Sequence, residues 1–495
     1  MNLRPHLLPA RLLRWAVIGA GALVLWVACG VRFANYDTLY ALAWGGQLWR
    51  GEVPSYGTAI APTPHPLIEA LGVLLAPLSP HTIIFVAVAL GYLALAGCGW
   101  VIYRLGSEWF GRPAGAFAAL IMLTRVAVLS YGPRAYIDIP YLLLVLSALL
   151  VETRRRRAGA PVLALLAIAG LLRPEAWFFS GLYWLYLVGL TPRLALVSWK
   201  ERKFPRPALT RSKILLTLLG ASAPLVWVLS DLAITGHLLW SLTNTRHTAE
   251  TLHRNTGIAN VPQYIPRRIG EILRPPVLVG AALGGVMSLL RLRERARLGA
   301  SAGVVAVAVF VVMAAAGLPI NTRYAFLAAA ILAIFCGVGA FGWLLLERDD
   351  PHRRWWSLAG AAVLVAFLAF APSQYDAVRG QLKDLKRQQR IEDDLVALVN
   401  EGSIKLACGP VEVTNHAPIP LLALYLKASP ARIVSAQSRQ ITDGTYIEPA
   451  NTEVERYYVL DAHDPVPRQV TVPPGFTATR TNRSWLIFEK CGASR

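Results

Sequence analysis

Ionisable residues set into apolar sequence are the first sign of chemistry in this chain. Asp37 follows an apolar run that ends near residue 31, and it opens an aromatic-rich segment that leads back to apolar sequence around His65. A carboxylate at the edge of an apolar span is costly unless it is paired or has a function. Its chemistry would be proton transfer, because a carboxylate can take the proton of a hydroxyl group. Asp37 is therefore the leading candidate for a catalytic base.

Other ionisable residues enter apolar sequence farther along the chain, in the segments SYGPRAYIDIPYLLL, GLLRPEAWFF and GLPINTRYAFL. Such residues, when they enter apolar spans from one side, suggest a shared cavity at the membrane boundary. Each one alone has a plainer explanation: an arginine at a helix end often extends to the lipid headgroups, and Arg173 can form a local pair with Glu175. The candidates for the shared cavity are Glu52, His65, Glu69, Arg134, Asp138, Arg173, Glu175 and Arg323.

The elements that position these residues follow from the composition. The chain has 495 residues, of which 55% are hydrophobic and 16% charged, and its mean hydropathy is +0.46. Its apolar runs reach the roughly 20 residues that a membrane-spanning helix needs. We therefore expect a polytopic α-helical membrane protein with about 11 transmembrane helices. The expected spans are 15–31, 82–103, 114–130, 138–151, 161–173, 176–190, 214–235, 276–290, 299–317, 323–346 and 356–372.

The formal net charge of +20 is concentrated in every second loop between these spans. The positive-inside rule assigns such loops to the cytoplasm, so the N-terminus is cytoplasmic and an odd number of spans places the C-terminus outside. Topology and contact with membrane lipids account for the charge, and nucleic acid is not an expected partner. The basic loops are residues 4–14, 104–112, 154–157, 193–213, 291–297 and 348–354.

Two apolar segments have an ambiguous relation to the membrane. Residues 66–78 are too short to cross and contain Glu69, so we expect a re-entrant or interfacial helix there. The first apolar run follows basic residues, as in a secretory signal, but it lacks a convincing small-residue cleavage site. We therefore expect an uncleaved first span.

The composition changes after residue 372. An amphipathic helix is indicated by the apolar residues at helical spacing from Ile391 to Leu398. A second helix is expected in PIPLLALYLKA, and short apolar runs follow at RIVSA and SWLIFEK. We therefore divide the chain into a transmembrane domain, residues 1–372, and a small extracytoplasmic α/β domain, residues 373–495, which is large enough to have its own core.

The cysteines are distributed in agreement with this division. Cys29, Cys98 and Cys336 lie in apolar spans, where they are expected to be packing residues. Cys408 and Cys491 are in the C-terminal domain, and they form a disulfide if that domain faces an oxidising compartment; free thiols are the alternative. The spacing of the cysteines does not suggest a metal site.

In their order, three of these segments resemble motifs of the GT-C superfamily of integral-membrane glycosyltransferases, in the branch with protein O-mannosyltransferases and lipid A aminoarabinose transferases. That branch has an acid soon after the first span and then a Lys-Pro-Pro-Leu type motif, similar to Asp37 followed by PTPHPL here. An acid before a proline in a second external loop is matched by Asp138-Ile139-Pro140, and a late span that begins with Arg-Tyr is matched by Arg323 and Tyr324. Where the branch commonly has lysine, this chain has His65, which replaces a permanent cation with a titratable one.

The resemblance implies a function at the cell membrane. The chain would be an inverting glycosyltransferase that moves a sugar from a polyprenyl-phosphate donor to a hydroxyl of a glycan, lipid or protein acceptor on the extracytoplasmic face. Asp37 would be the general base, and Asp138 would orient the acceptor or the base, with Glu175 as a weaker candidate for that role. No cofactor is expected beyond the lipid-linked donor substrate, and the sequence leaves a requirement for a divalent metal open. The other residues implied at the substrate site are His65, Arg134, Arg173, Arg323 and Tyr324.

The sequence is also compatible with two other classes of protein. A transporter of a lipid or glycan precursor also gathers charges in the membrane, although it usually places them near the midplane on broken helices of repeated halves. A non-catalytic membrane scaffold would need none of these acids. The one-sided placement of the charges favours the enzyme.

Overall fold

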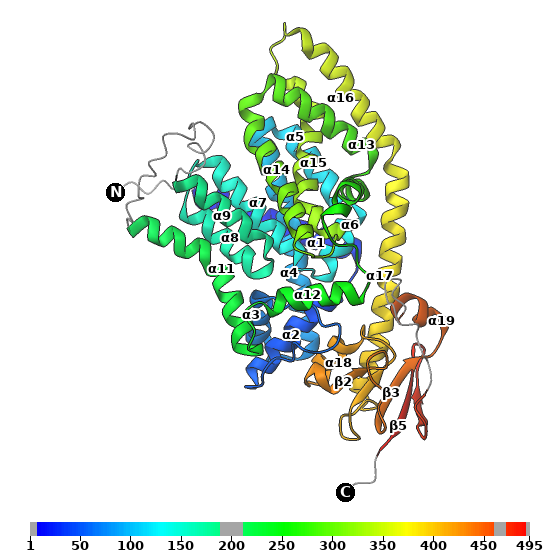
Figure 1. Ribbon diagram of the computed structural model, residues 1–495. Coiled ribbons are helices and arrows are strands. Elements are labelled where there is room, and N and C mark those ends of the chain that lie inside the picture. The colour runs from blue at the N-terminus through cyan, green and yellow to red at the C-terminus, as the bar shows by residue number, and fades with distance from the viewer. Residues whose placement is uncertain (1–6, 189–210, 460–471, 492–495) are drawn as a thin grey trace.

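The computed structural model describes residues 7–188, 211–459 and 472–491. Figure 1 shows a bundle of helices with a small sheet at one end. Residue 4 and residues 193–210, which belong to two of the predicted basic loops, lie outside the described residues. The helices of the bundle are α1 (Leu7–Cys29), α4 (Pro80–Phe110), α5 (Arg112–Leu123), α6 (Val126–Tyr131), α7 (Asp138–Arg154), α8 (Ala160–Leu172), α9 (Glu175–Val188), α11 (Arg211–Thr235), α13 (Val261–Arg291), α14 (Arg293–Ala315), α15 (Phe326–Phe341) and α16 (Pro351–Ala369).

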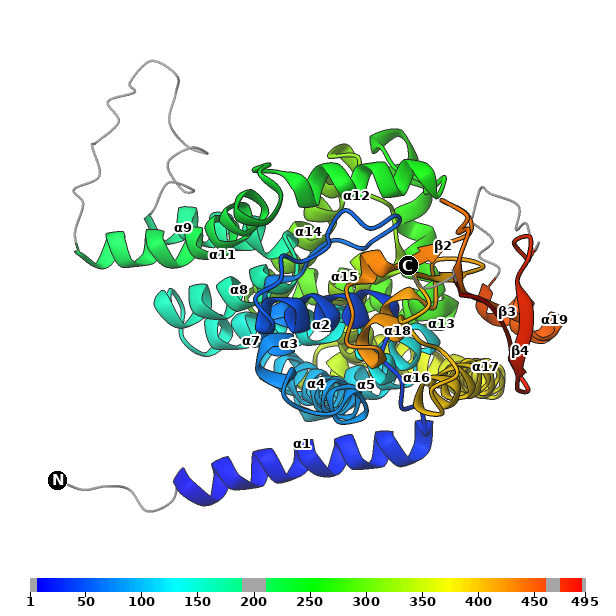
Figure 2. The ribbon, with the colours of Figure 1, turned by 90° about the horizontal axis from the view of Figure 1, so that it is seen from below.

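Each predicted span coincides with one of these helices or with a pair of them. Six described helices are long and apolar enough to cross a membrane, and the bent pairs α5 with α6 and α16 with α17 (Ala371–Asn400) raise the number to eight. The remaining predicted spans, α7, α8 and α9, have only 17, 13 and 14 residues. Figure 2 shows α1 at the edge of the bundle, where it packs against α4.

Between the first two long helices the chain forms α2 (Tyr36–Trp49) and α3 (Pro66–Leu75). With 10 residues, α3 is too short to cross a membrane, as predicted for this segment. The two helices pack in direct backbone contact, since a Cβ on Gly45 would lie 2.4 Å from the carbonyl oxygen of Glu69. A larger residue than glycine at that position would push α2 and α3 apart.

The C-terminal part of the chain holds a five-stranded sheet with the strand order β2-β1-β3-β5-β4. The first three strands in that order are parallel, and β5 runs antiparallel to both β3 and β4. The strands are β1 (Val411–Val413), β2 (Ile433–Ser435), β3 (Gly444–Pro449), β4 (Thr477–Thr481) and β5 (Trp485–Lys490). Strands β2 and β5 lie at the predicted runs RIVSA and SWLIFEK.

Two helices connect this domain to the bundle. The long helix α17 continues from α16, as Figure 1 shows, and it buries Ile391, Leu395 and Leu398, the apolar residues that indicated an amphipathic helix. Helix α18 (Ile419–Tyr425) forms within the predicted segment PIPLLALYLKA and packs against α2. The C-terminal domain therefore lies directly against α2, the helix that carries Asp37 in its first turn.

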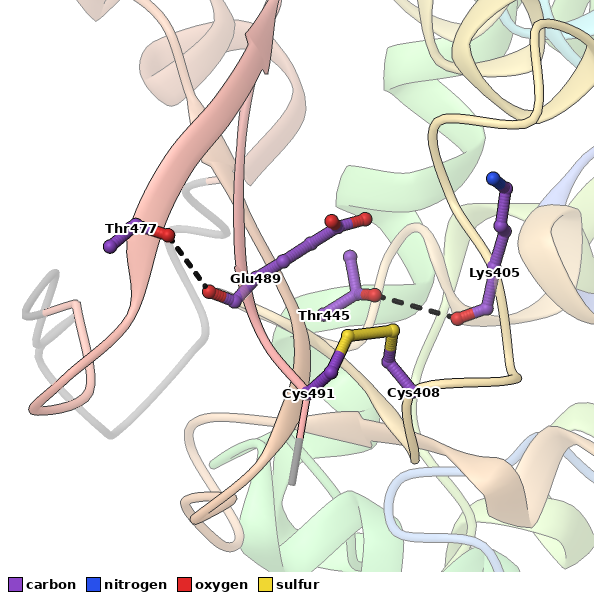
Figure 3. The surroundings of a disulfide bond; sticks show 6 residues. All are labelled: Lys405, Cys408, Thr445, Thr477, Glu489 and Cys491. Carbon is purple, nitrogen blue, oxygen red and sulfur yellow. Dashed lines mark hydrogen bonds between the residues drawn. A yellow bond between two sulfur atoms is a disulfide. The ribbon is translucent and has the colours of Figure 1, made fainter. Parts of the chain in front are cut away.

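A disulfide joins Cys408 to Cys491 across 83 residues of sequence. Figure 3 shows the bond where the chain enters and leaves the sheet, beside the hydrogen bond from Thr445 Oγ1 to the carbonyl oxygen of Lys405. The bond therefore ties the last strand to the start of the domain. The three cysteines of the bundle are buried free thiols, in keeping with a packing role.

Candidate active site

The position of Asp37 is set by the cap of α2. The Asn35 side-chain oxygen accepts hydrogen bonds from the backbone N–H groups of Asp37 and Thr38, at 2.9 and 3.2 Å. The Asn35 amide also donates to the carbonyl oxygen of Arg134, which fixes the start of α2 to the segment before α7. Asp37 consequently lies in the first helical turn, where the positive end of the helix dipole favours a carboxylate.

Arg323 is the direct partner of Asp37, although 286 residues separate them. Its Nη1 lies 2.7 Å from Asp37 Oδ2 and 3.8 Å from Asp138 Oδ2. Arg323 belongs to a short 3-10 helix, Thr322–Ala325, that precedes α15. The Thr322 hydroxyl donates to Glu271 on α13 at 3.1 Å, and this bond holds the turn in place. The ion pair therefore joins the start of α2 to the turn before α15.

A second arginine extends this network into the bundle. Arg173 forms buried ion pairs with Asp138 and with Glu175, and its Nη2 lies 2.6 Å from Glu175 Oε1. Its guanidinium carbon also lies 4.4 Å above the centre of the Tyr324 ring. Arg173 ends α8 and Glu175 begins α9, so each side chain stands at the helix end that favours its charge. Three carboxylates and two guanidiniums thus form one continuous cluster that includes Asp37.

A cavity of about 590 Å³ opens beside this cluster. Asp138 does not line this cavity but a separate, much smaller space. It is connected to the cavity through its ion pairs with Arg173 and Arg323, which line both spaces. Arg134 is not brought to the cavity: its guanidinium donates to Ser130 and lies over the Tyr136 ring. The predicted residues that line the cavity are Asp37, His65, Arg173, Glu175, Arg323 and Tyr324.

The charges around Asp37 decide its protonation state. Burial, the largest single cause, would raise the pKa of the Asp37 carboxyl, but the attraction and hydrogen bond of Arg323, with a smaller contribution from Arg173, hold this pKa below its ordinary value. Asp37 is therefore ionised at neutral pH. The ion pair uses Oδ2, which leaves Oδ1 for a hydroxyl group in the cavity.

His65 differs from the titratable cation expected from the sequence. Burial lowers the pKa of His65 to about 3, and the Arg173 and Arg323 guanidiniums also lower it, so the ring is neutral at physiological pH. Its Nδ1 is buried without a hydrogen-bond partner among the described residues. The backbone N–H of His65 donates to Glu69, whose other oxygen accepts from the Tyr56 hydroxyl at 2.6 Å. Glu69 therefore positions the loop that carries His65.

The structure adds three lining residues that were not recognised in the sequence. Arg254 follows α12 (Trp240–Thr251), Asp231 lies on α11, and His416 comes from the C-terminal domain. No clear signal existed for Arg254, because it stands in a polar loop segment between α11 and α13 without a neighbouring apolar run that would make its charge conspicuous. His416 stands in a domain whose packing against α2 could not be read from periodicity.

An apolar groove of about 1200 Å³ adjoins the cavity. Tyr136 and Ile137 line both spaces, so the groove and the cavity meet at these residues. The groove continues between α1, α4 and α7 to three arginines at its far end, Arg14, Arg104 and Arg154. Its walls are mainly Leu, Ile, Val and Ala side chains, which are suited to a hydrocarbon chain. Within the described part of the chain, no group of three or more His, Cys, Asp or Glu residues is arranged to hold a metal ion.

Comparison with known proteins identifies relatives in structure only. No protein-family model and no curated protein sequence matches the chain. Its fold is similar to crystal structures of ArnT from Cupriavidus metallidurans. The structure bound to undecaprenyl phosphate has a TM-score of 0.51 and 12% identity, and the match covers 96% of this chain and 97% of that chain. The apo structure has a TM-score of 0.54 and 14% identity, with 97% and 98% covered.

At these identities the likeness is one of fold. It extends over nearly the whole chain, so it includes both the helical bundle and the C-terminal domain. The expected fold class, a polytopic helical membrane protein with a small C-terminal α/β domain and a GT-C-like architecture, is thereby confirmed.

Proposed function

We propose that this protein is an inverting glycosyltransferase of the membrane, which transfers a sugar from a polyprenyl-phosphate donor to an acceptor hydroxyl. The single observation that carries the proposal is the Asp37–Arg323 ion pair, at 2.7 Å, in a cavity that meets an apolar groove. The fold adds support, because one of the two similar ArnT structures contains undecaprenyl phosphate.

The two spaces fit the two halves of such a donor. The isoprenoid tail would lie in the apolar groove, and the sugar phosphate would pass Tyr136 and Ile137 into the polar cavity. Arg323 and Arg254 are the cations placed to contact the phosphate there, whereas Arg134 is directed elsewhere. A guanidinium suits this role because it is always charged and binds phosphate oxygens in pairs.

The reaction would be a single displacement. Asp37 takes the proton of the acceptor hydroxyl while the hydroxyl oxygen forms a bond to the anomeric carbon. The bond between that carbon and the phosphate oxygen breaks, and polyprenyl phosphate leaves with the electron pair. Arg323 offsets the negative charge that develops on the leaving phosphate. Attack from the face opposite to the leaving group inverts the anomeric configuration.

Asp138 and Glu175 act in this scheme as positioning residues. They hold Arg173, and Asp138 also lies 3.8 Å from Arg323, so their main effect is to fix the guanidiniums; Asp138 does so from outside the cavity. The neutral His65 ring can form a hydrogen bond between its Nδ1 atom and a sugar hydroxyl. It adds no charge to the cavity. The phosphate would therefore be recognised by arginines alone.

The acceptor would approach from beneath the C-terminal domain. His416 and Ala417 of that domain line the cavity, and the His416 ring lies 5.5 Å from the Tyr36 ring, next to Asp37. The Cys408–Cys491 disulfide is typical of an oxidising compartment, which supports an extracytoplasmic site. The arginines at the far end of the apolar groove agree with that orientation.

Transfer by purified protein in liposomes tests the proposal. Labelled polyprenyl-phosphate sugars are supplied together with glycan, lipid and peptide acceptors, and matched nucleotide sugars serve as the control donors. We expect transfer from the lipid-linked donors only, with an inverted configuration in the product. Movement of the donor across the bilayer without any sugar transfer would contradict the proposal and identify the protein as a transporter.

A further inference from the structure

A second buried arginine lies in the bundle away from the candidate active site. Arg125 is only 4% exposed, and none of the described carboxylates pairs with it. Its guanidinium donates instead to the carbonyl oxygens of Ile121 and Leu273 and to the Thr124 hydroxyl, at 3.0, 3.2 and 3.0 Å. An ionised side chain inside a membrane domain is costly without compensation, so these contacts need an explanation.

Breaks in two helices explain the carbonyl contacts. The first break separates α5 from α6 with a bend of 57°, directly at Thr124 and Arg125. The second lies within α13, where Arg274 has a φ of 67° and is followed by Pro275 and Pro276. Both breaks expose carbonyl groups at the negative end of a helical segment. The two helix ends therefore offset the charge of Arg125.

The charge of Arg274 is not offset in the same way. Arg274 lines the same cavity of about 230 Å³ as Arg125, and its exposed guanidinium has no hydrogen bond or carboxylate partner among the described residues. The remaining walls are mostly apolar and include Leu129, Val277 and Phe367. Two cations thus face one small apolar cavity that lacks an anion of its own.

The position of the cavity indicates which anion it receives. Phe370, Gln374 and Tyr375 line it at the 40° bend where the apolar helix α16 passes into the charged helix α17. Figure 1 shows this junction at the outer edge of the bundle, at the start of the long helix α17 that leads to the C-terminal domain. An apolar helix that gives way to a charged one marks the level of the lipid headgroups.

We propose that this cavity binds the phosphate of an anionic membrane lipid. The phosphate contacts Arg274 and the edge of the Arg125 guanidinium, and an acyl chain extends along the apolar walls toward Phe367. Guanidinium groups suit this ligand because they form paired hydrogen bonds to phosphate oxygens. The lipid would brace three helix discontinuities, and it would do so whether or not the protein transfers sugars.

Native mass spectrometry and thermal unfolding in the presence of added lipids test the site. Purified full-length protein is titrated with phosphatidylglycerol or phosphatidylcholine, and separately with inorganic phosphate. We expect about a tenfold preference for phosphatidylglycerol, because phosphatidylcholine carries the same phosphate together with a cationic choline that the two arginines repel. Arg274→Gln should abolish the preference, whereas Arg390→Gln, on the exposed face of α17, should leave it unchanged.

A second pair of variants distinguishes a lost lipid site from a protein that no longer folds. Tyr375 is 64% exposed at the rim of the cavity, so substitutions there are tolerated structurally. Tyr375→Glu should reduce phosphatidylglycerol binding about tenfold through charge repulsion, and Tyr375→Gln should not. An unchanged lipid preference in both Arg274→Gln and Tyr375→Glu would overturn the proposal. Equal stabilisation by inorganic phosphate would also overturn it, because the site would then not recognise a lipid.

Discussion

The cavity beside Asp37 and the cavity beside Arg125 both contain buried arginines, but they differ in what balances the charge of those arginines. In the cavity beside Asp37, Arg173 and Arg323 face three carboxylates within one cluster. In the cavity beside Arg125, helix ends offset one arginine while Arg274 has no described anionic partner. A cluster of mixed sign is suited to moving protons and charge during a reaction, whereas a cluster of one sign is suited to holding an anion.

The local structure explains why the two cavities share a design. Both lie where helices end within the bundle, which exposes backbone dipoles and allows charged side chains at a depth where they are otherwise expensive. Asp37 gains from the start of α2 and Arg125 from the ends of two helical segments. The sign of the exposed helix end thus matches the sign of the buried residue in each case.

Removal of the central cation should have the largest effect on the mixed cluster. Arg323→Gln leaves Asp37 unpaired and removes the cation proposed to offset the leaving phosphate, so we expect sugar transfer to fall about a thousandfold. Without Arg323, burial dominates and the pKa of Asp37 rises, so the acid limb of the pH–rate profile moves to higher pH. Arg323→Lys should recover part of the rate. An unchanged profile in Arg323→Gln would show that the pair has no role in transfer.

Asp138→Asn should change the stability of the same cluster more than its chemistry. The substitution leaves Arg173 with Glu175 alone and deprives Arg323 of its second carboxylate. Removal of one partner of a buried ion pair costs about 4 kcal/mol, which should appear as a lower unfolding temperature in detergent. We expect kcat to fall about tenfold with little change in the KM of the donor. A loss as large as that of Asp37→Asn would instead make Asp138 a participant in the reaction.

Glu69 is a buried acid near the cavity, and it pairs with none of the described cations. Burial raises the pKa of Glu69 to about 7, above the ordinary 4.5, although Tyr56 and the His65 backbone donate hydrogen bonds to it. The folded protein therefore binds this proton more tightly, and stability is lost as the pH rises from 4.5 through 7. The expected loss is on the order of 3 kcal/mol. Unfolding midpoints from pH 5 to 8 should show a smaller decline in Glu69→Gln than in wild type, and Glu52→Gln serves as the exposed control.

The smallest effect is expected when Arg125, the buried one of the two cations in the second cavity, is replaced. Arg125→Met leaves the carbonyl oxygens of Ile121 and Leu273 without this donor, and we expect a stability loss of about 2 kcal/mol. Sugar transfer should remain within a factor of two, because the cavity is separate from Asp37. A large loss of transfer in a stably folded Arg125→Met would connect the two cavities and contradict the comparison.

Much of the fold could be predicted because apolar runs and basic loops report directly on membrane helices. Each predicted span coincides with a helix or a pair of helices, and the amphipathic pattern around Ile391 correctly predicted a helix, α17. The number of helices long enough to cross alone is lower than expected, since α7, α8 and α9 are short and surrounded by other helices. Hydropathy locates a helix but does not report whether it spans the bilayer unaided.

The candidate site could be predicted only in part, for physical reasons. Asp37 and Arg323 were both candidates for one cavity because charge is rare beside apolar runs, but nothing in the sequence indicated that these residues, 286 positions apart, form a direct ion pair. Arg134 has the same sequence character as Arg323, yet its guanidinium bonds to its own turn at Ser130. The neutral state of His65 follows from burial between two arginines, which is a property of the folded cluster.

Asp37 is the proposed base of the sugar transfer, and a single-turnover assay of Asp37→Asn tests this role most directly. Donor binding is measured in parallel, and Asp376→Asn, an exposed acid on α17, is the matched control. We predict that Asp37→Asn binds the donor within a few-fold of wild type but transfers sugar about a thousand times more slowly, while Asp376→Asn transfers normally. Full transfer by folded Asp37→Asn would contradict the account.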